Sequence, residues 1–417
     1  MGSRARDLVL PAVLATALAA LLAKAGTLTM AFTDYEVEAE PALALLRGGD
    51  VAGFLQALPA YGGSLILRAP FALAPDLWGG GDHALFRSMA VPCLIASVIL
   101  AVVLWRRAVE RGSGRWPALL AVTLCAGNPV TLRALETGHP EEILGAALCV
   151  AAVMAAGANR ALLAGLLLGL AMANKPWAVL ALAPALLVLP ERRMVALSVG
   201  GLVAAAVMAP MLLVGGSAIT AVSNSATQTG DIFQPWQVWW FFGDHGEVVR
   251  GLVGEKPGYR AAPGWVGTVT RPLVVLVPLA VCLMLARQMR ARPWHDGLLL
   301  LALVLLLRCL LDPWNVVYYE LPFLLALLAW EIHARPGWPL LSLFATALSW
   351  FTLERLSEIA SPDLQAVAFL AWGVPLAVVM TVHLSGRLPA LGGHRRGHRS
   401  PGLPARAQPS PIAADMR

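Results

Sequence analysis

This sequence contains few charged residues. Only 13% of its 417 residues are Asp, Glu, Lys or Arg, whereas 58% are hydrophobic and the mean hydropathy is +0.69. About a quarter of the residues in a soluble globular domain are charged, so this composition excludes an ordinary soluble protein. Apolar stretches long enough to cross a bilayer recur along the chain, which predicts a polytopic membrane protein.

Cysteine is also scarce, and a glycine-rich nucleotide-binding loop of the Rossmann type is missing. All five cysteines fall inside apolar runs, and none has the spacing of metal ligands. We therefore expect buried thiols that act as small hydrophobic side chains and do not form a metal site. The net charge of +6 does not indicate a nucleic-acid partner, because in a membrane protein the distribution of charge over the loops is what matters.

The predicted fold is all-α: a transmembrane bundle of about twelve segments. Residues 1–384 form one domain, and residues 385–417 form a basic tail that we expect to be disordered. The first run is too long for a signal-peptide core, so we expect an uncleaved helix. The segments are 8–29, 84–105, 116–134, 141–157, 161–173, 176–190, 194–214, 266–286, 297–311, 319–332, 337–353 and 365–384.

Loop charge predicts the orientation of the chain in the membrane. Short basic loops such as RRAVERGSGR (106–115) and RQMRARPW (287–294) alternate with loops that carry most of the 25 acidic residues. By the positive-inside rule the basic loops and both termini face the cytoplasm. The two longest loops, 30–83 and 215–265, then lie on the extracytoplasmic face of the plasma membrane, where we expect the functional site.

The stretch FTDYEVEAEPALALLRGGD (32–50) places four carboxylates directly after the first apolar run. Glu36, Glu38 and Glu40 alternate at a spacing of two, so they cannot share one helix face, and we interpret them as solvated loop charges. Asp34 lies about one turn beyond the first span, close to the bilayer plane. A carboxylate in a partly desolvated pocket there can act as a general base, so Asp34 is the candidate catalytic residue.

Two further segments of this loop have helical signals. Pro41 suits a first helical position and Gly48–Gly49 a helix end, which predicts a short amphipathic helix in the interface. The stretch YGGSLILRAPFALAPDLWGGGD (61–82) is apolar but contains Arg68, and we expect Pro70 and Pro75 to break it. We interpret it as a segment that dips into the outer interface without crossing the membrane.

The stretch LRALETGHPEEILGAALCV (132–150) gathers Arg133, His139, Glu141 and Glu142 around a helix–turn–helix junction. Acidic residues in a first helical turn complement the helix dipole, which is the simpler explanation for both glutamates. A single histidine is weak evidence for a metal site. The other hypothesis is a substrate-facing turn, with Arg133, His139 and Glu142 as candidate binding residues.

Between two short apolar helices stands NKPW (174–177), which places Asn174 and Lys175 at the outer face. A lysine at membrane depth is costly and usually has a function, although its ammonium can also snorkel to the surface. The functional hypothesis is an ammonium group that binds a phosphate, with Asn174 beside it.

Aromatic residues gather in two further outer segments. SNSATQTGDIFQPWQVWWFFGDHG (223–246) ends in a run that is typical of an interfacial anchor. Aromatic faces also pack on sugar rings and isoprenoid chains, so Trp236 is a candidate binding residue. RCLLDPWNVVYYELPFLL (308–325) places Asp312 and Tyr318 at another outer junction, either as anchors or as the wall of a polar site.

In their order along the chain, these motifs resemble the GT-C superfamily of integral-membrane glycosyltransferases. The resemblance is closest to glycosyltransferase family 87, the polyprenyl-phosphate-mannose-dependent mannosyltransferases of actinobacteria, and extends from about residue 8 to 384. The residues that carry it are FTDYEVEAEPALALLRGGD, YGGSLILRAPFALAP, NPVTLRALETGHPEE, LLLGLAMANKPWAVLALAP, FQPWQVWWFFG and DPWNVVYYELPFL.

The resemblance implies a role for several residues. Asp34 matches the catalytic base of the first extracytoplasmic loop, and Lys175 is the best match for the basic residue that holds the lipid phosphate, with Arg68 and Arg133 as helpers. Many relatives carry a histidine near the late outer junction, where this chain has DPWNVVYY. That departure leaves the roles of Asp312 and Tyr318 open.

The implied reaction is an inverting displacement that needs one base and no nucleotide. We expect no metal cofactor from the sequence, and metal dependence stays open. The sugar leaves a polyprenyl phosphate and joins a lipid-linked or cell-envelope glycan acceptor. Mannose follows from the family, while arabinose and glucose stay open, as does the choice between a glycolipid and a glycan acceptor. Membrane lipids are the remaining expected partners.

A transporter or flippase of a lipid-linked glycan is the alternative function. It predicts internal repeats and ionisable residues near the middle of the membrane. The sequence has no obvious repeat and few charges within its spans, of which Arg308 is the clearest. A structural or assembly protein is the third hypothesis, and it requires no clustering of Asp34, His139 and Lys175 around one cavity.

Overall fold

A computed structural model describes residues 2–30, 34–74, 83–214, 233–246, 249–251 and 254–386. The described chain is almost entirely helical, which confirms the predicted all-α class. Its strands are the two-residue β1 (Arg250–Gly251) and β2 (Gly254–Glu255), which pair antiparallel. The predicted tail lies outside the described residues from 387 onward, and so do 75–82 and 215–232 of the two long outer loops.

Each of the twelve predicted segments corresponds to a helix or to a consecutive pair of helices. Those of the first half are α1 (Gly2–Thr29), α5 (Ala84–Glu110), α6 (Arg115–Ala126) with α7 (Pro129–Glu136), α8 (Glu141–Gly157), α9 (Ala161–Asn174), η3 (Pro176–Ala181) with α10 (Leu182–Val188), and α11 (Arg193–Val214). Those of the second half are α13 (Val266–Met289), α14 (Asp296–Leu311), η5 (Val317–Glu320) with α15 (Leu321–Ala334), α16 (Leu340–Trp350) with η6 (Phe351–Arg355), and α17 (Pro362–Leu384).

Six helical stretches in the described part of the chain are long and apolar enough to cross a membrane. The protein is therefore a membrane protein. The stretches are Asp7–Thr29, Ala84–Glu110, Arg115–Glu136, Arg193–Val214, Val266–Met289 and Pro362–Leu384.

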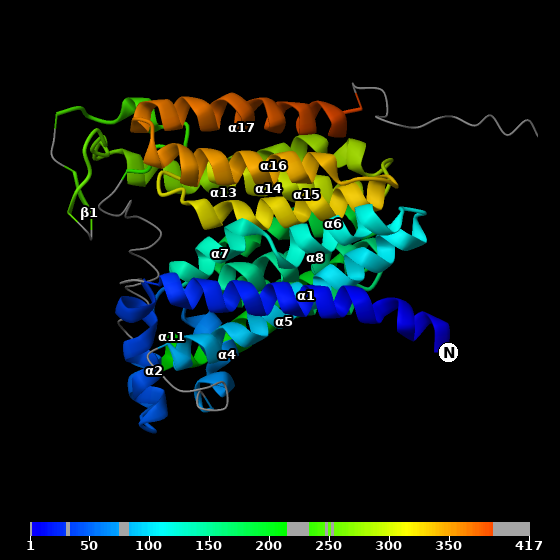
Figure 1. The fold of residues 1–417 in the computed structure, drawn as a ribbon, viewed down its shortest axis with the longest axis horizontal. Helices are drawn as coiled ribbons and strands as arrows, with labels where there is room; N and C mark the ends of the chain where they lie inside the picture. The colour runs from blue at the N-terminus through cyan, green and yellow to red at the C-terminus, as the bar shows by residue number, and fades with distance from the viewer. Residues whose placement is uncertain are drawn as a thin grey trace, which may run out of the picture.

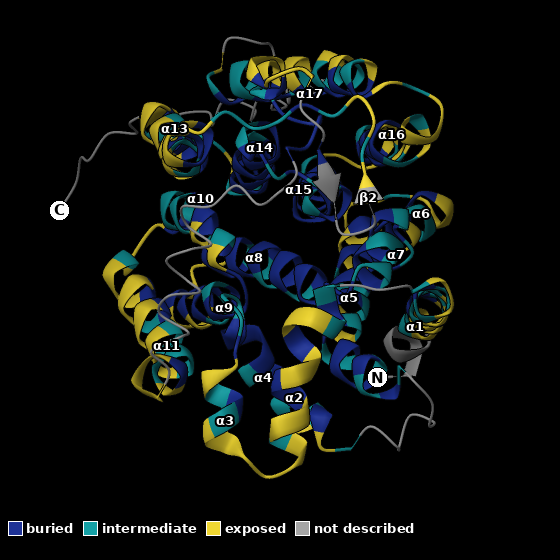
Figure 2. Cartoon of the chain, turned by 90° about the vertical axis from the view of Figure 1, so that its left-hand side faces the viewer, coloured by how far each residue is buried: buried dark blue, intermediate teal, exposed yellow. Residues whose placement is uncertain are grey.

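The helices run side by side along the long axis of the molecule (Figure 1). Seen from one end, α8, α14 and α15 occupy the interior, while α1, α11, α13 and α17 form the periphery and expose apolar side chains (Figure 2). Nearly every residue of α14 and α15 is buried. An apolar exterior around a buried helical core is the arrangement expected of a bundle surrounded by lipid.

The first long loop, between α1 and α5, contains η1 (Tyr35–Ala39), α2 (Glu40–Arg47), α3 (Val51–Gln56) and α4 (Gly62–Ala72). Helix α2 buries Ala42 and Leu43 and exposes Glu40 and Arg47, which confirms the predicted short amphipathic helix. It ends at Gly48, as predicted. Figure 1 shows α2 lying across the end of α1 rather than parallel to it.

Helix α4 corrects the prediction that Pro70 breaks this segment. The helix continues through Pro70 and ends at Ala72, so the proline stands in the last turn, where it disrupts few hydrogen bonds. Its eleven residues span about 16 Å, too little to cross a bilayer. Instead α4 packs against α5, α9 and α11 and buries Arg68 within the bundle.

The predicted segment 116–134 is not one continuous helix. It breaks at Asn128, which has extended backbone angles because the following Pro129 disfavours the helical region. The Asn128 side chain then accepts a hydrogen bond of 3.0 Å from the Val130 amide and caps α7. The break turns the chain toward the outer end of the bundle, where α7 leads into the His139 turn.

The aromatic run after 233 is not a uniform interfacial anchor. Phe241 and Phe242 are exposed, as an anchor requires, but Trp236 and Trp240 are buried. Trp240 stacks on Phe233 at 5.7 Å between ring centroids and donates a hydrogen bond to Asp363. These two tryptophans therefore hold the outer loop against the bundle instead of lying in the bilayer interface.

Helices α9 and α11 pack closely because small residues, among them glycines, lie at their interface. A Cβ atom added at Gly169 would lie 2.6 Å from the Gly200 carbonyl oxygen and 2.6 Å from Val203 Cβ. We expect Gly169→Ala to force the two helices apart and lower the free energy of unfolding by about 1–3 kcal/mol. The midpoint of thermal unfolding of the purified protein in detergent measures this.

Gly201→Ala on α11 is the matched control. A Cβ atom at Gly201 would have no neighbour within 4 Å, and alanine favours a helix over glycine. This variant is expected to be at least as stable as the wild type. Equal midpoints for the Gly169→Ala variant and the wild type would contradict the close packing of α9 on α11.

Candidate active site

A buried carboxylate, that of Glu141, is the centre of a polar cluster near the end of the bundle where α1 ends. It is 1% exposed and stands at the first position of α8. Its Oε1 lies 2.9 Å from His139 Nδ1 and 3.0 Å from Lys175 Nζ, and its Oε2 lies 3.2 Å from Arg68 Nη2. A buried charge is tolerated when it is paired in this way.

The turn between α7 and α8 places His139 and Glu141 next to each other. Gly138 has φ of 90°, a left-handed conformation that a glycine adopts without strain. The amide of His139 then donates a hydrogen bond of 2.7 Å to the Ala134 carbonyl and closes α7. Gly138 therefore reverses the chain so that the His139 side chain contacts Glu141 in the first turn of α8.

Lys175 reaches the same cluster from the break between α9 and η3. Its backbone is extended, with φ −148° and ψ 130°, because Pro176 follows it. The preceding Asn174 donates a hydrogen bond of 2.9 Å to the Glu141 backbone carbonyl and accepts one of 2.8 Å from Ser64 of α4. The two short helices predicted on either side of NKPW thus meet at a break that contacts Glu141.

Asp34, His139 and Glu141 form a hydrogen-bonded series that runs from the surface to the interior. Asp34 Oδ2 lies 2.9 Å from His139 Nε2, so the imidazole bridges Asp34 and Glu141. The Asp34 side chain is 40% exposed whereas that of His139 is 6% exposed. Tyr318 packs on the imidazole with ring centroids 4.8 Å apart. The arrangement fixes the orientation of the Asp34 carboxylate and leaves it accessible.

Burial lowers the pKa of His139, but its hydrogen bonds to Asp34 and Glu141 outweigh burial and raise the pKa to about 9. The imidazole is therefore protonated at neutral pH and donates one hydrogen to each carboxylate. A protonated histidine in this position is a positioning group and is not available as a base.

A cavity of about 550 Å³ adjoins the cluster, between η3, α13 and α14. Tyr61, Glu142 and Lys175 line the part next to the cluster, and Val179, Leu180, Val274 and Val275 line an apolar part. Arg271 and Asp312 pair with each other on its wall, with Nη1 and Oδ1 3.2 Å apart. Such a cavity suits a molecule with a polar head and an apolar tail.

Arg308 is the most unusual residue of this cavity. Its side chain is 3% exposed and stacks on Tyr319, 4.0 Å from the ring centroid, and on Trp177, at 5.0 Å. Among the described residues Nη1 of its guanidinium is buried without a hydrogen-bond partner. The carboxylates of Glu142 and Asp312 are near enough to act on its charge. A buried, unsatisfied cation is costly unless a ligand pairs with it.

The cluster and the cavity have an excess of one positive charge. The positive groups are four: His139, Lys175, Arg68 and Arg308. The negative groups are the three carboxylates of Asp34, Glu141 and Glu142. Within the described ranges, no group of three or more His, Cys, Asp or Glu side chains has the arrangement of a metal site. The site is therefore suited to an anionic ligand that carries its own apolar part.

The structure brings together seven of the ten residues predicted from the sequence. They are Asp34, Arg68, His139, Glu142, Asn174, Lys175 and Tyr318. Asp312 is an eighth, on the cavity wall.

Arg133 and Trp236 lie elsewhere. Arg133 pairs with Glu354 at 3.0 Å and with Glu136 at 3.4 Å. Trp236 is buried in the core and accepts a hydrogen bond from Asn315 through its backbone carbonyl.

Sequence reasoning missed the importance of two residues. Glu141 was explained by the helix dipole, although its carboxylate carries three ion pairs or hydrogen bonds. The sequence analysis noted Arg308 only as a charged residue within an apolar segment and assigned it no role in the site. Because such a charge is rare and costly in a span, it could have been used to predict a binding residue.

Comparison with known proteins identifies the family. The sequence model of glycosyltransferase family 87 matches residues 63–313, which is more than half of the chain. The protein belongs to glycosyltransferase family 87. No match was found among curated proteins.

Membership of family 87 decides between the functions considered from the sequence. The protein is a glycosyltransferase, so it uses a sugar donor and an acceptor, and the transporter hypothesis is set aside. The matched range includes Arg68, His139, Glu141, Lys175 and Arg308, but it begins after Asp34. The role of Asp34 therefore rests on its geometry in this member of family 87.

The raised pKa of His139 predicts how stability depends on pH. A histidine whose pKa is raised on folding, from about 6.5 to about 9, stabilises the protein fully below pH 6.5. That contribution, on the order of 3 kcal/mol, is lost as the pH rises from 6.5 through 9. We expect the unfolding midpoint of the wild type to fall over this range.

The wild type is compared with the His139→Gln variant, because glutamine does not titrate. The difference between the midpoints of wild type and variant, measured from pH 6 to 10, should shrink as the pH rises. A difference that is constant with pH would show that His139 is not protonated in the folded protein.

Proposed function

We propose that this family 87 glycosyltransferase moves a sugar from a polyprenyl phosphate to a lipid-linked or cell-envelope glycan acceptor. The observation that supports this most is the pairing of two features at one site. An accessible carboxylate, Asp34, is held by a buried histidine, and a partly apolar cavity is lined by an arginine, Arg308, whose Nη1 is buried without a hydrogen-bond partner. A base and an anion site for a lipid phosphate are what such a transfer requires.

The donor is assigned to the cavity between η3, α13 and α14. Its apolar wall suits the isoprenoid chain, and its cations suit the phosphate. Lys175 is a weaker phosphate ligand than the sequence suggested, because Glu141 and Glu142 lie 3.0 Å and 3.5 Å from its ammonium. Arg308 makes no ion pair at such short range among the described residues, although Glu142 and Asp312 act on its charge. A guanidinium binds phosphate through two parallel hydrogen bonds. We therefore assign the phosphate to Arg308, with Lys175 beside it.

Asp34 is assigned the role of base. The carboxylate takes the proton of the acceptor hydroxyl as the hydroxyl oxygen attacks the anomeric carbon. The bond between that carbon and the phosphate oxygen breaks, and the phosphate leaves with the electron pair, stabilised by Arg308. Protonated His139 donates to Asp34 Oδ2 and so leaves Oδ1 free for the acceptor. One displacement of this kind inverts the anomeric configuration.

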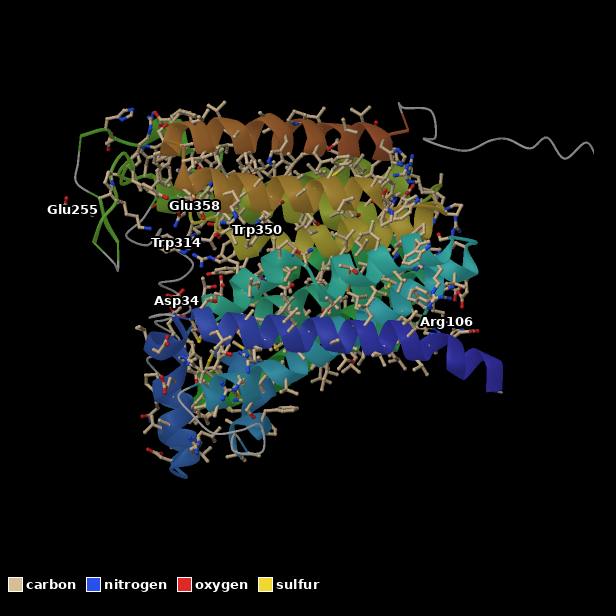
Figure 3. All side chains as sticks on the ribbon, in the orientation of Figure 1. Asp34, Arg106, Glu255, Trp314, Trp350 and Glu358 are labelled. Carbon is tan, nitrogen blue, oxygen red and sulfur yellow. The ribbon has the colours of Figure 1, made fainter. Side chains whose placement is uncertain are left out.

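The orientation in the membrane follows from the positions of charged loops. Asp34 and Arg106 lie at opposite ends of the bundle in Figure 3. Arg106 belongs to a basic loop assigned to the cytoplasm. Helix α1 begins and helix α17 ends at the Arg106 end (Figure 1). We therefore place both termini in the cytoplasm and the active site on the extracytoplasmic face of the plasma membrane.

Mannose is the proposed sugar, on the strength of the resemblance to polyprenyl-phosphate-mannose-dependent enzymes. The chemistry assigned to Asp34 and Arg308 is common to any sugar carried on a polyprenyl phosphate. Radiolabelled mannose, arabinose and glucose donors, offered separately to membranes that contain the protein, identify which one is used.

Asp34→Asn tests the proposed base. The amide keeps the size of the side chain but accepts no proton, so we expect sugar transfer to fall by about 10²- to 10⁴-fold. Transfer from radiolabelled polyprenyl-phosphate sugar is measured in membranes with equal amounts of protein. Glu40→Gln is the control, since Glu40 is an exposed carboxylate of the same loop and should leave transfer unchanged. Transfer that survives in the Asp34 variant would remove Asp34 as the base.

Arg308→Gln tests the proposed phosphate site. Loss of a charged hydrogen-bond donor should raise the KM for the donor by about 10- to 100-fold. The variant should be at least as stable as the wild type without donor, because a buried unsatisfied cation is removed. Arg355→Gln, on an exposed arginine paired with Glu358, is the control. A less stable variant with an unchanged KM would show that Arg308 has a structural role only.

A further inference from the structure

A hollow of about 530 Å³ lies at the other end of the bundle from the candidate active site. It is lined by Asn159, Arg160 and the first residues of α9 on one side, and by Arg192 and Val195 on the other. We call this the α9–α11 hollow. Helix α9 begins here and has 14 residues, so about 21 Å separate the hollow from Lys175 at the far end of that helix. The hollow is therefore separate from the polar cluster and from the donor cavity.

The two helices that border the hollow begin side by side. A Cβ atom added at Gly165 of α9 would lie 2.5 Å from the Ala196 carbonyl oxygen of α11. One added at Gly169 would lie 2.6 Å from the Gly200 carbonyl oxygen. The contact moves four residues forward on both helices, so α9 and α11 run parallel. Their N-termini, each the positive end of a helix dipole, therefore meet at the hollow.

The positive charge at the hollow is not neutralised within the described chain. Arg160 and Arg192 are exposed, and neither guanidinium makes an ion pair or a hydrogen bond with a described residue. The first turns of α9 and α11 contain no acidic residue, and no side chain caps α9. Glu191 precedes Arg192 in the sequence but is exposed and does not line the hollow. Two cations beside two helix N-termini favour the binding of an anion.

The backbone conformation of Arg192 indicates that its side chain has a use. Its φ is 55°, in the left-handed region, which glycine and asparagine adopt readily and which is costly for a long side chain. The turn before α9 has an asparagine, Asn159, in the same conformation, with φ of 56°. An arginine in a strained conformation, where asparagine would form the turn at lower cost, is a candidate binding residue.

Apolar side chains continue from the hollow along the outside of the bundle. Leu162 is 66% exposed, and Leu163 and Val195 are each 38% exposed. Helix α11, which carries Val195, lies at the periphery of the bundle in Figure 2. A small soluble anion would contact the arginines but leave this apolar surface uncovered. A lipid matches both parts, because its acyl chains lie along the helices and its phosphate lies at the membrane surface.

We propose that the α9–α11 hollow binds one anionic phospholipid of the surrounding membrane. Arg160 and Arg192 bind its phosphate, and its acyl chains lie against Leu162 and Val195. In the orientation proposed above, the hollow faces the cytoplasm, so this lipid belongs to the cytoplasmic leaflet. It is separate from both substrates, and its binding does not depend on the proposed sugar transfer. Because it contacts both helices, it stabilises the packing of α9 on α11.

The first experiment measures stabilisation by defined lipids. The full-length protein in an uncharged detergent is titrated with phosphatidylglycerol, which is anionic, or with phosphatidylcholine, which is not. The midpoint of thermal unfolding is followed, since a ligand of the folded state raises it. The test variant combines Arg160→Gln with Arg192→Asn, because asparagine suits the left-handed conformation. We expect its midpoint without lipid to equal or exceed that of the wild type, and its apparent affinity for phosphatidylglycerol to fall about tenfold.

Arg115→Gln is the matched control. Arg115 is an exposed arginine at the start of another helix, α6, and does not line the hollow. This variant should respond to phosphatidylglycerol as the wild type does. A second measurement counts the lipids that stay bound, by native mass spectrometry at equal phosphatidylglycerol concentration. The wild type and the Arg115 variant should each retain one phosphatidylglycerol more than the double variant.

Several outcomes would overturn the site. Equal stabilisation of the wild type by phosphatidylglycerol and phosphatidylcholine would show that the hollow does not select an anionic lipid. A double variant that is less stable without lipid, but keeps the wild-type response to phosphatidylglycerol, would show that the two arginines have a structural role only. Equal stabilisation by inorganic phosphate at the same concentration would show an anion site without a role for the acyl chains.

Discussion

The ion pairs of Glu141 are the interaction on which the outer end of this bundle depends. One carboxylate, 1% exposed, is held by Arg68 from α4, His139 from the preceding turn and Lys175 from the break between α9 and η3. Each of these charges is costly to bury alone, so the four groups are stable only together. The network therefore fixes where α4, α8 and α9 meet, and the site residues are positioned as a consequence.

The same network explains why two cationic residues have different roles in the proposed reaction. Lys175 is committed to Glu141 and Glu142, so its charge mainly holds the site together. Arg308 is buried against Trp177 and Tyr319, and its Nη1 has no hydrogen-bond partner in the described chain. A protein retains such a destabilising group where a ligand pairs with it, and the phosphate of a lipid-linked sugar is the ligand that we propose.

Much of the fold could be predicted because the membrane restricts the possible structures. In lipid the backbone hydrogen bonds must be made within helices, so the length of the apolar runs alone located the twelve segments. The charge of the loops then predicted which membrane face each segment end lies on. The errors came from local chemistry that depends on packing. Pro70 was expected to end α4 but stands in its last turn, and Asn128 divides a segment that seemed continuous. Trp236 was expected near the substrate but is buried in the core.

Residue types and their order along the sequence determined the class of the protein, the family resemblance and most of the candidate site residues. Asp34, His139 and Lys175 could be singled out because polar groups next to apolar spans are rare and costly. Only the tertiary structure decided which of these groups touch. It made Glu141 the centre of the network, placed Arg133 and Trp236 away from the polar cluster and left Arg308 facing a cavity. The physical reason is that burial and pairing depend on contacts between helices far apart in the chain, which no local pattern records.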